Sequence, residues 1–317
     1  MESQVQETTA PQFSRIVAVT NRDVQQSEAE EARRTTDEVT EKARRERYRA
    51  LIVPREHGAW GLLLVPMVTG AGVAFHHSTR VFPFVLLLTA ALALFWLRTP
   101  LESLLGISAM RAETKEERSS VTFVIAYLAM VAGLASSMLL WGGQHPLIWG
   151  MGAAAGLAFV GQALLRKMGR RTRMLSEIVG TIGLTSSAPA VYYVITGRFG
   201  ITAWVLWLAN LIFAGNQIHY VQIRIHTTKV VGIRAKIARA WGFGAGQIAM
   251  LAAIAAMCLL GFMPWLAAIA FVPLLLRGFY YFVQKPAPLR VRRLGWNELA
   301  QAIIFCVLFV TIFSLSL

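Results

Sequence analysis

The residues best suited to binding or catalysis cluster at positions 216–226, which read NQIHYVQIRIH. On a helix, side chains three, four and seven positions apart share one face. That face would carry four polar side chains: Asn216, His219, Gln222 and His226. Arg224 adds a guanidinium, which can bind an anion through two parallel hydrogen bonds. The pattern fits a ligand-binding surface, but hydrogen bonding between neighbouring helices explains it as well, and two histidines without a carboxylate are a weak signal for a metal ion.

Two further groups of polar residues lie in otherwise apolar sequence. Residues 54–60 read PREHGAW, in which Arg55 and His57 could donate hydrogen bonds to an anionic head group. The same residues also suit the start of a helix that is anchored at a membrane surface. Arg98 lies two residues before Pro100. It either ends a membrane span as a charged stop signal or lines a cavity, because Pro100 is expected to break the helix there.

Carboxylates are scarce beyond the first 50 residues. Aspartate occurs only at positions 23 and 37, and Glu177 and Glu298 stand in largely apolar sequence. Because a carboxylate near membrane depth is costly unless it is paired, Glu177 either forms an ion pair with Arg98 or Arg224 or belongs to a binding site. Hard cations such as Mg²⁺ need carboxylate oxygens, so the sequence predicts no metal ion and no cofactor.

Long apolar segments must position these side chains. The chain has 317 residues, of which 56% are hydrophobic and 15% charged, whereas soluble domains are roughly 45–50% apolar. Segments of about 20 apolar residues, the length that crosses a bilayer, occur nine times: 57–75, 81–97, 121–141, 147–165, 175–196, 199–223, 240–261, 263–282 and 296–316. The sequence therefore predicts an all-α bundle of nine transmembrane helices.

The basic residues between these segments predict the orientation of the bundle. Twenty of them gather in alternate connections: 98–120, 166–174, 224–239 and 277–295, together with Arg55. The remaining connections hold only Arg80 and Arg198. Since cytoplasmic loops are enriched in Lys and Arg, we predict an N-inside, C-outside topology. Anionic lipid head groups then account for the net charge of +14, and no nucleic-acid partner is predicted.

The first 50 residues differ sharply from the rest of the chain. They hold 19 of its 48 charged residues and little that could form a core. The predicted organisation is a charged cytoplasmic tail over 1–50, either disordered or a solvated helix, followed by a transmembrane domain over 51–317.

The motif at 54–60, together with Arg98-Thr99-Pro100, closely resembles the YwiC-like membrane proteins, a family of bacterial polytopic proteins. The resemblance extends from residue 52 to the C-terminus. It implies a multi-pass protein of the bacterial cytoplasmic membrane.

The organisation more remotely resembles the UbiA-type intramembrane prenyltransferases, which have nine helices and a cytoplasm-facing cavity. Residues 175–180 and 188–193 are similar to the fifth helix of their menaquinone-type members, and 216–224 falls where these enzymes have a second aspartate-rich motif. The resemblance implies an isoprenoid diphosphate ligand that is held through Mg²⁺. Tyr220 and Arg224 stand where the aspartates are expected, so any such ligand would be bound without the metal.

The leading hypothesis is a basic, cytoplasm-facing pocket that binds an isoprenoid diphosphate, a quinone precursor or another amphipathic anion next to the membrane lipids. Transfer of that ligand by a non-canonical prenyltransferase-like reaction is a further alternative, for which no catalytic residue is identified. The candidate ligand-binding residues are Arg55, His57, Arg98, Glu177, Asn216, His219, Gln222 and Arg224. The competing hypothesis is a transporter or an accessory subunit of a membrane complex. Because these residues crowd the predicted inner side, a one-sided pocket is favoured over a permeation path.

Overall fold

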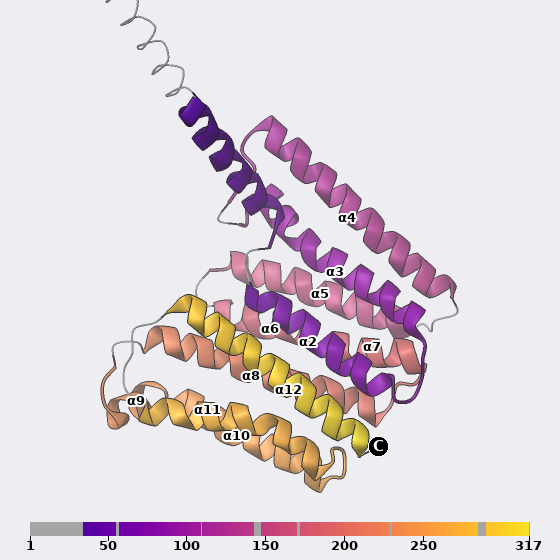
Figure 1. Cartoon of the computed structure of the whole chain (residues 1–317), viewed down its shortest axis with the longest axis vertical. Coiled ribbons are helices and arrows are strands. Elements are labelled where there is room, and N and C mark those ends of the chain that lie inside the picture. The colour runs from indigo at the N-terminus through magenta and orange to yellow at the C-terminus, as the bar shows by residue number, and fades with distance from the viewer. Residues whose placement is uncertain are drawn as a thin grey trace, which may run out of the picture. The chain divides into compact units, whose positions relative to one another are not determined.

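The computed structural model describes residues 34–54, 57–108, 110–142, 147–169, 172–227, 230–284 and 290–316, and every regular element among them is helical (Figure 1). A first helix covers residues 34–52. The helices that follow are α2 (His57–Ala74), α3 (Val81–Leu104), α4 (Lys115–Trp141), α5 (Leu147–Lys167), α6 (Arg173–Thr185), α7 (Ser187–Thr196), α8 (Ile201–His226), α9 (Ile233–Arg239), α10 (Trp241–Leu259), the 3-10 helix η2 (Trp265–Phe271), α11 (Val272–Val283) and α12 (Val291–Leu315).

Eight helical segments within the described residues are long and apolar enough to cross a membrane. They coincide with eight of the nine predicted spans, one of them formed by α6 and α7 together and another by η2 and α11. The remaining predicted span corresponds to α2, whose apolar part, Trp60–Ala74, is shorter. The chain is thus an all-α, multi-pass membrane protein, while the count of nine spans and the N-inside orientation stay predictions.

The break expected at Pro100 does not occur. α3 continues through Pro100 to Leu104 without interruption. A proline removes one backbone donor and restricts the residue before it, but here only one further turn of helix follows it. The expectation that a broken helix places Arg98 at a cavity is therefore wrong for this helix.

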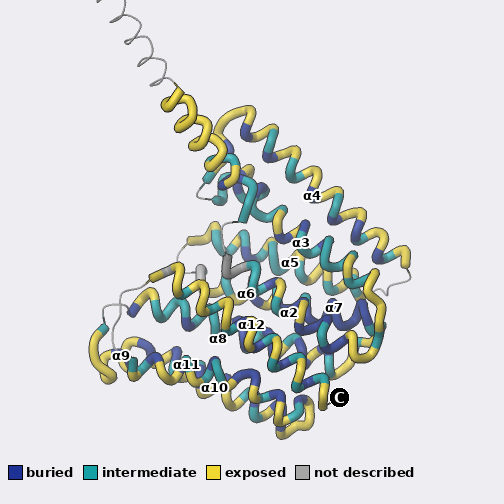
Figure 2. Tube along the Cα trace, in the orientation of Figure 1, coloured by how far each residue is buried: buried dark blue, intermediate teal, exposed yellow. Residues whose placement is uncertain are grey.

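The helices divide into two compact units, each of which is described by itself. The smaller unit combines residues 1–53 with 99–123. Within it, helix 34–52 exposes its side chains to solvent over the first three turns (Figure 2) and buries only Ala50 and Leu51 near its end. The exposed turns carry the charges that set this segment apart in the sequence.

Glu117 holds the smaller unit together. Its carboxylate accepts hydrogen bonds from the backbone N–H groups of Glu113, at 2.9 Å, and Thr114, at 3.3 Å, while its own N–H donates to the Thr114 hydroxyl. This reciprocal pattern is a capping box, which satisfies the free N–H groups at the start of α4. Arg47 of helix 34–52 donates to the same carboxylate at 2.5 Å, so one buried side chain joins the N-terminal helix to the start of α4.

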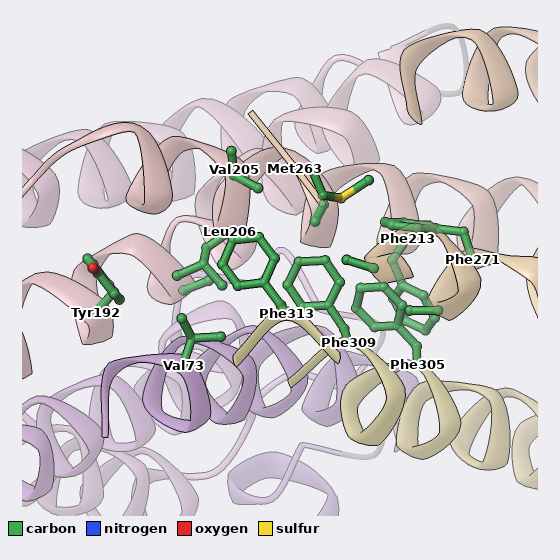
Figure 3. Close-up of a cluster of buried hydrophobic side chains, with 14 of the residues drawn as sticks. Val73, Tyr192, Val205, Leu206, Phe213, Met263, Phe271, Phe305, Phe309 and Phe313 are labelled. Atoms are coloured by element: carbon green, nitrogen blue, oxygen red, sulfur yellow. The ribbon is translucent and has the colours of Figure 1, made fainter. Parts of the chain in front are cut away.

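The larger unit, residues 54–98 and 124–317, is built around a row of aromatic side chains (Figure 3). Phe305, Phe309 and Phe313 recur every four residues on α12, stack on one another and are almost fully buried. Phe213 of α8 stacks on Phe305 with ring centroids 4.3 Å apart. α7 is the most enclosed element, because it is buried at every residue from Ala188 to Ile195, as expected for a helix that is apolar all round.

α2 is locked between α7, α8 and α12 by close contacts. A Cβ atom at Gly70 would overlap the backbone carbonyl of Ala188 on α7, so only glycine permits this approach. On α8, the Asn210 amide donates to the Thr69 hydroxyl of α2 at 2.8 Å. This hydrogen bond joins the middle of α8 to α2.

Candidate functional site

Six of the eight predicted site residues have described side chains. Arg55 lies outside the described residues, and so does the side chain of His57 at the start of α2. Arg98 lies on α3 and is half-buried. Glu177 is half-buried on α6, and α8 carries the buried Asn216 and three half-buried residues, His219, Gln222 and Arg224.

The structure brings Glu177 together with Gln222. The Gln222 amide donates a hydrogen bond to the Glu177 carboxylate, which joins α6 to the polar end of α8. The sequence predicted an ion pair of Glu177 with Arg98 or Arg224, which stays a prediction, and the structure adds the Gln222 amide as a partner. A charge-assisted hydrogen bond of this kind satisfies a carboxylate near membrane depth.

The two histidines of α8 have separate surroundings. The His219 ring packs edge-on against Phe243 of α10, with centroids 5.2 Å apart, and its Nδ1 atom faces Gly246. His226 is exposed, and its Nδ1 atom lies 2.7 Å from the carbonyl oxygen of Gln222 on its own helix. Neither contact resembles metal ligation, which requires several ligand atoms around one point.

A buried ion pair lies next to Tyr220 on the other side of α8. The Arg277 guanidinium of α11 stacks on the Tyr220 ring, 4.0 Å from its centroid, and its Nη1 group donates to the Glu298 carboxylate of α12 at 2.6 Å. Gln217 donates to the backbone carbonyl of Glu298 at 2.8 Å. The Arg277 and Glu298 side chains are only 12% and 13% exposed. Residues of three helices, α8, α11 and α12, thus meet at one charged pair.

Sequence reasoning missed Arg277 as a site residue. It assigned this arginine to the connection 277–295, whereas the structure places it inside α11, halfway along an apolar helix. The signal that could have found it is the run VPLLLRGFYYFV, in which one charge interrupts eleven uncharged residues. A charge within a membrane span is a candidate functional residue by default.

Lys236 of the short helix α9 closes the same end of the bundle. Its ammonium donates to the backbone carbonyls of Tyr281, at 3.3 Å, and Gln284, and it lies 5.3 Å from the centroid of the Tyr281 ring. A cation at a helix C-terminus is stabilised by the free carbonyls there. Burial lowers the pKa of Lys236, and the nearby charge of Arg224 lowers it further.

Several buried polar atoms around this ion pair have no hydrogen-bond partner. They are Asn216 Oδ1, Gln247 Oε1, Nε and Nη2 of Arg277, Glu298 Oε2 and Gln301 Oε1. The Gln247 side chain fills the space beside Gly278, next to Arg277 in sequence, and Gln301 lies one turn beyond Glu298 on α12. Since buried polar groups are almost always paired, this cluster is suited to receiving a polar ligand or water.

The fold and these buried charges define a multi-pass membrane protein with a polar cluster at one end of α8. Residues 53–192 match the YwiC-like protein family, which confirms the predicted resemblance over this part of the chain. The match includes Arg55, His57, Arg98 and Glu177, while the polar residues of α8, α11 and α12 lie beyond it. No significant match is found among curated proteins or among solved structures, and the UbiA-like architecture stays a prediction.

The residues present do not fit the Mg²⁺ ion that the UbiA resemblance implies. Tyr220 is covered by the Arg277 guanidinium, and Arg224 is itself a cation. Across the described ranges, no three His, Cys, Asp or Glu residues are grouped so that they could hold a metal ion. The donor set of this cluster is therefore suited to anions rather than to a hard divalent cation.

Proposed function

We propose that this membrane protein binds an amphipathic anion, such as an isoprenoid diphosphate or an anionic quinone precursor, at the polar end of α8. In the predicted topology, this end faces the cytoplasm. Cationic side chains take the place of a bridging metal ion, because a guanidinium can bind a phosphate directly through two hydrogen bonds.

The observation that carries this proposal is the gathering of cationic side chains from α8, α9 and α11 around the polar end of α8. Arg224 lies in the last turn of α8, one turn beyond Tyr220, on whose ring the Arg277 guanidinium stacks. Lys236 donates to the backbone carbonyl of Tyr281 at the end of α11. Two like charges in a poorly solvated region repel each other. An anion bound among these cations would lower that repulsion, which supports anion binding at this end of the bundle.

Aromatic and aliphatic side chains next to these cations are the reason for proposing a ligand that has an apolar part as well as an anionic head group. Tyr220, Phe243 and Tyr281 form a buried cluster, against which Ile223 and Phe282 pack. The apolar part of a ligand whose head group reaches the cations would lie next to these side chains. A small, fully hydrated anion would gain nothing from them.

The test is a titration of farnesyl diphosphate and geranylgeranyl diphosphate against the full-length protein in detergent, with Mg²⁺ or with EDTA. We expect binding that EDTA does not change, and a weakening of about 10- to 150-fold for Arg224→Gln, the cost of one lost bidentate contact. Arg98→Gln tests the contribution of the predicted site residue on α3. Arg198→Gln, which alters an exposed arginine in a tight turn, is the matched control and should bind like the wild type.

Two results would argue against this function. Binding that requires Mg²⁺ and ignores both arginine substitutions would show that carboxylates, not cations, hold the head group. Failure of every anion to bind would favour the alternative hypothesis, a transporter or an accessory subunit of a membrane complex.

A further inference from the structure

The orientation of the Arg277 guanidinium is fixed on two sides. One of its faces lies on the Tyr220 ring, and its Nη1 group is tied to Glu298. Glu298 is held in turn through its backbone carbonyl by Gln217. A guanidinium that is stacked and hydrogen-bonded in this way loses little further freedom when it binds a ligand.

The remaining edge of this guanidinium has no partner. Its Nε and Nη2 atoms are both buried, and neither makes a hydrogen bond. These two groups lie on the same edge of the planar guanidinium and project parallel N–H bonds, the geometry that matches two oxygens of a carboxylate or a phosphate. Glu298 engages only the Nη1 group, so the two N–H groups of this edge are left without a hydrogen-bond partner.

Two buried acceptor oxygens of α12 also lack a hydrogen-bond partner. The second carboxylate oxygen of Glu298, Oε2, is buried without a partner, and so is Oε1 of Gln301, one helical turn further along α12. An anion alone would not satisfy these oxygens, because it offers no donor. A head group that carries an O–H or N–H donor beside its anionic oxygens would satisfy both kinds of orphaned group.

We propose that Arg277 is the anchor of an oxyanion subsite, in which its Nε and Nη2 groups bind a phosphate or carboxylate while Glu298 and Gln301 accept a hydrogen bond from a donor on the same head group. This inference rests on the proposed function for the amphipathic nature of the ligand. It adds the binding residue, the bidentate geometry and the requirement for a donor. A phosphate monoester meets the requirement through its P–OH group.

The probes are farnesyl phosphate, inorganic phosphate and farnesol, titrated against the full-length protein in nanodiscs of zwitterionic lipid at a pH near 6, where the monoester is partly protonated. Farnesyl phosphate should bind, and farnesol, which lacks the anion, should bind at least tenfold more weakly. If inorganic phosphate binds as tightly as farnesyl phosphate, the subsite is supported, and its natural occupant is a free phosphate rather than a lipid head group.

Arg277→Lys separates bidentate recognition from charge alone. Lysine keeps the positive charge but cannot present two parallel donors, so we expect affinity for farnesyl phosphate to fall about tenfold or more. Arg290→Lys, at an exposed arginine just before α12, is the matched control and should leave affinity unchanged. The donor requirement is tested with the monomethyl ester of farnesyl phosphate, a diester that keeps an anionic oxygen but has no P–OH group, and we expect it to bind at least tenfold more weakly than farnesyl phosphate.

The double variant Arg277→Met/Glu298→Leu distinguishes loss of binding from misfolding. It removes both buried charges together, so neither is left unpaired in the folded protein. It should keep a cooperative unfolding transition and lose the binding of farnesyl phosphate. If Arg277→Lys or this double variant binds farnesyl phosphate like the wild type, the subsite is overturned, while binding that still depends on Arg224 leaves the proposed function intact. If the wild type binds neither farnesyl phosphate nor farnesyl diphosphate, both proposals fall.

Discussion

Removing one partner of the Arg277–Glu298 pair should lower the free energy of unfolding far more than removing both. The two side chains are 2.6 Å apart and almost completely enclosed by α8, α11 and α12. Glu298→Leu leaves a buried guanidinium that cannot lose its proton. Of the described side chains, only the Tyr220 ring would then stabilise its charge. We expect this variant to lower the free energy of unfolding by about 3–5 kcal/mol, the usual cost of stranding a buried charge.

The reciprocal substitution should be milder. Arg277→Met leaves a carboxyl group, which can take up a proton and so avoid carrying an unpaired charge. Its expected cost is about 1–3 kcal/mol, that of an unsatisfied buried polar group. The double variant replaces the pair with apolar side chains of similar length, and its stability should lie within about 1 kcal/mol of the wild type.

Reversible unfolding in mixed detergent micelles, followed by the loss of helical circular dichroism, measures all three variants against the wild type. A double-mutant cycle gives the coupling between the two residues, which should reach at least about 2 kcal/mol. Glu41→Ala breaks the exposed pair between Glu41 and Arg45 and serves as a control without a measurable effect. Two single substitutions with equal, small and additive costs would show that the pair is well solvated and would refute the reasoning.

Three further predictions concern other parts of the chain. Glu177→Gln should be more stable to heat in detergent than Glu177→Leu, by about 1–3 kcal/mol, because the amide can still accept the hydrogen bond from α8; equal stability of the two would mean that the carboxylate is merely solvated. Gly70→Ala should destabilise the bundle by about 1–3 kcal/mol, since the added methyl group meets a backbone carbonyl of α7, whereas Gly150→Ala, with open space around it, should unfold at the wild-type temperature. Single cysteines at Gln144 and Leu317, in a variant without the native cysteines, should react with an impermeant thiol reagent from outside the cell; labelling of Leu317 only from the cytoplasm would show that the number of spans is wrong by an odd number.

The polar end of α8 shows how far local sequence reasoning reaches. Helical spacing alone placed Asn216, His219 and Gln222 on one face, and the structure keeps α8 helical from Ile201 to His226. The spacing could not tell which neighbour each side chain meets. Gln222 turns to Glu177, while His219 packs on the aromatic cluster, because neighbouring residues on one face still point to different helices.

Arg98 shows where a local rule misleads. Proline disfavours a helix, and the sequence therefore predicted a break after Arg98, yet α3 passes through Pro100. That a proline removes one backbone hydrogen bond from a helix can be read from the local sequence. Whether the fold tolerates that cost depends on packing and on how much helix follows, which the local sequence does not specify.

The sequence by itself determined that this protein is a bundle of apolar helices, because length and hydropathy are additive properties of consecutive residues. It also identified the end of α8 as polar, since side-chain spacing follows from helix geometry alone. Only the tertiary structure decided that Arg277, Glu298 and Tyr220 meet. Their contact joins three helices that are separate in sequence. It depends on how each helix is rotated and packed against the others, which composition and periodicity do not specify.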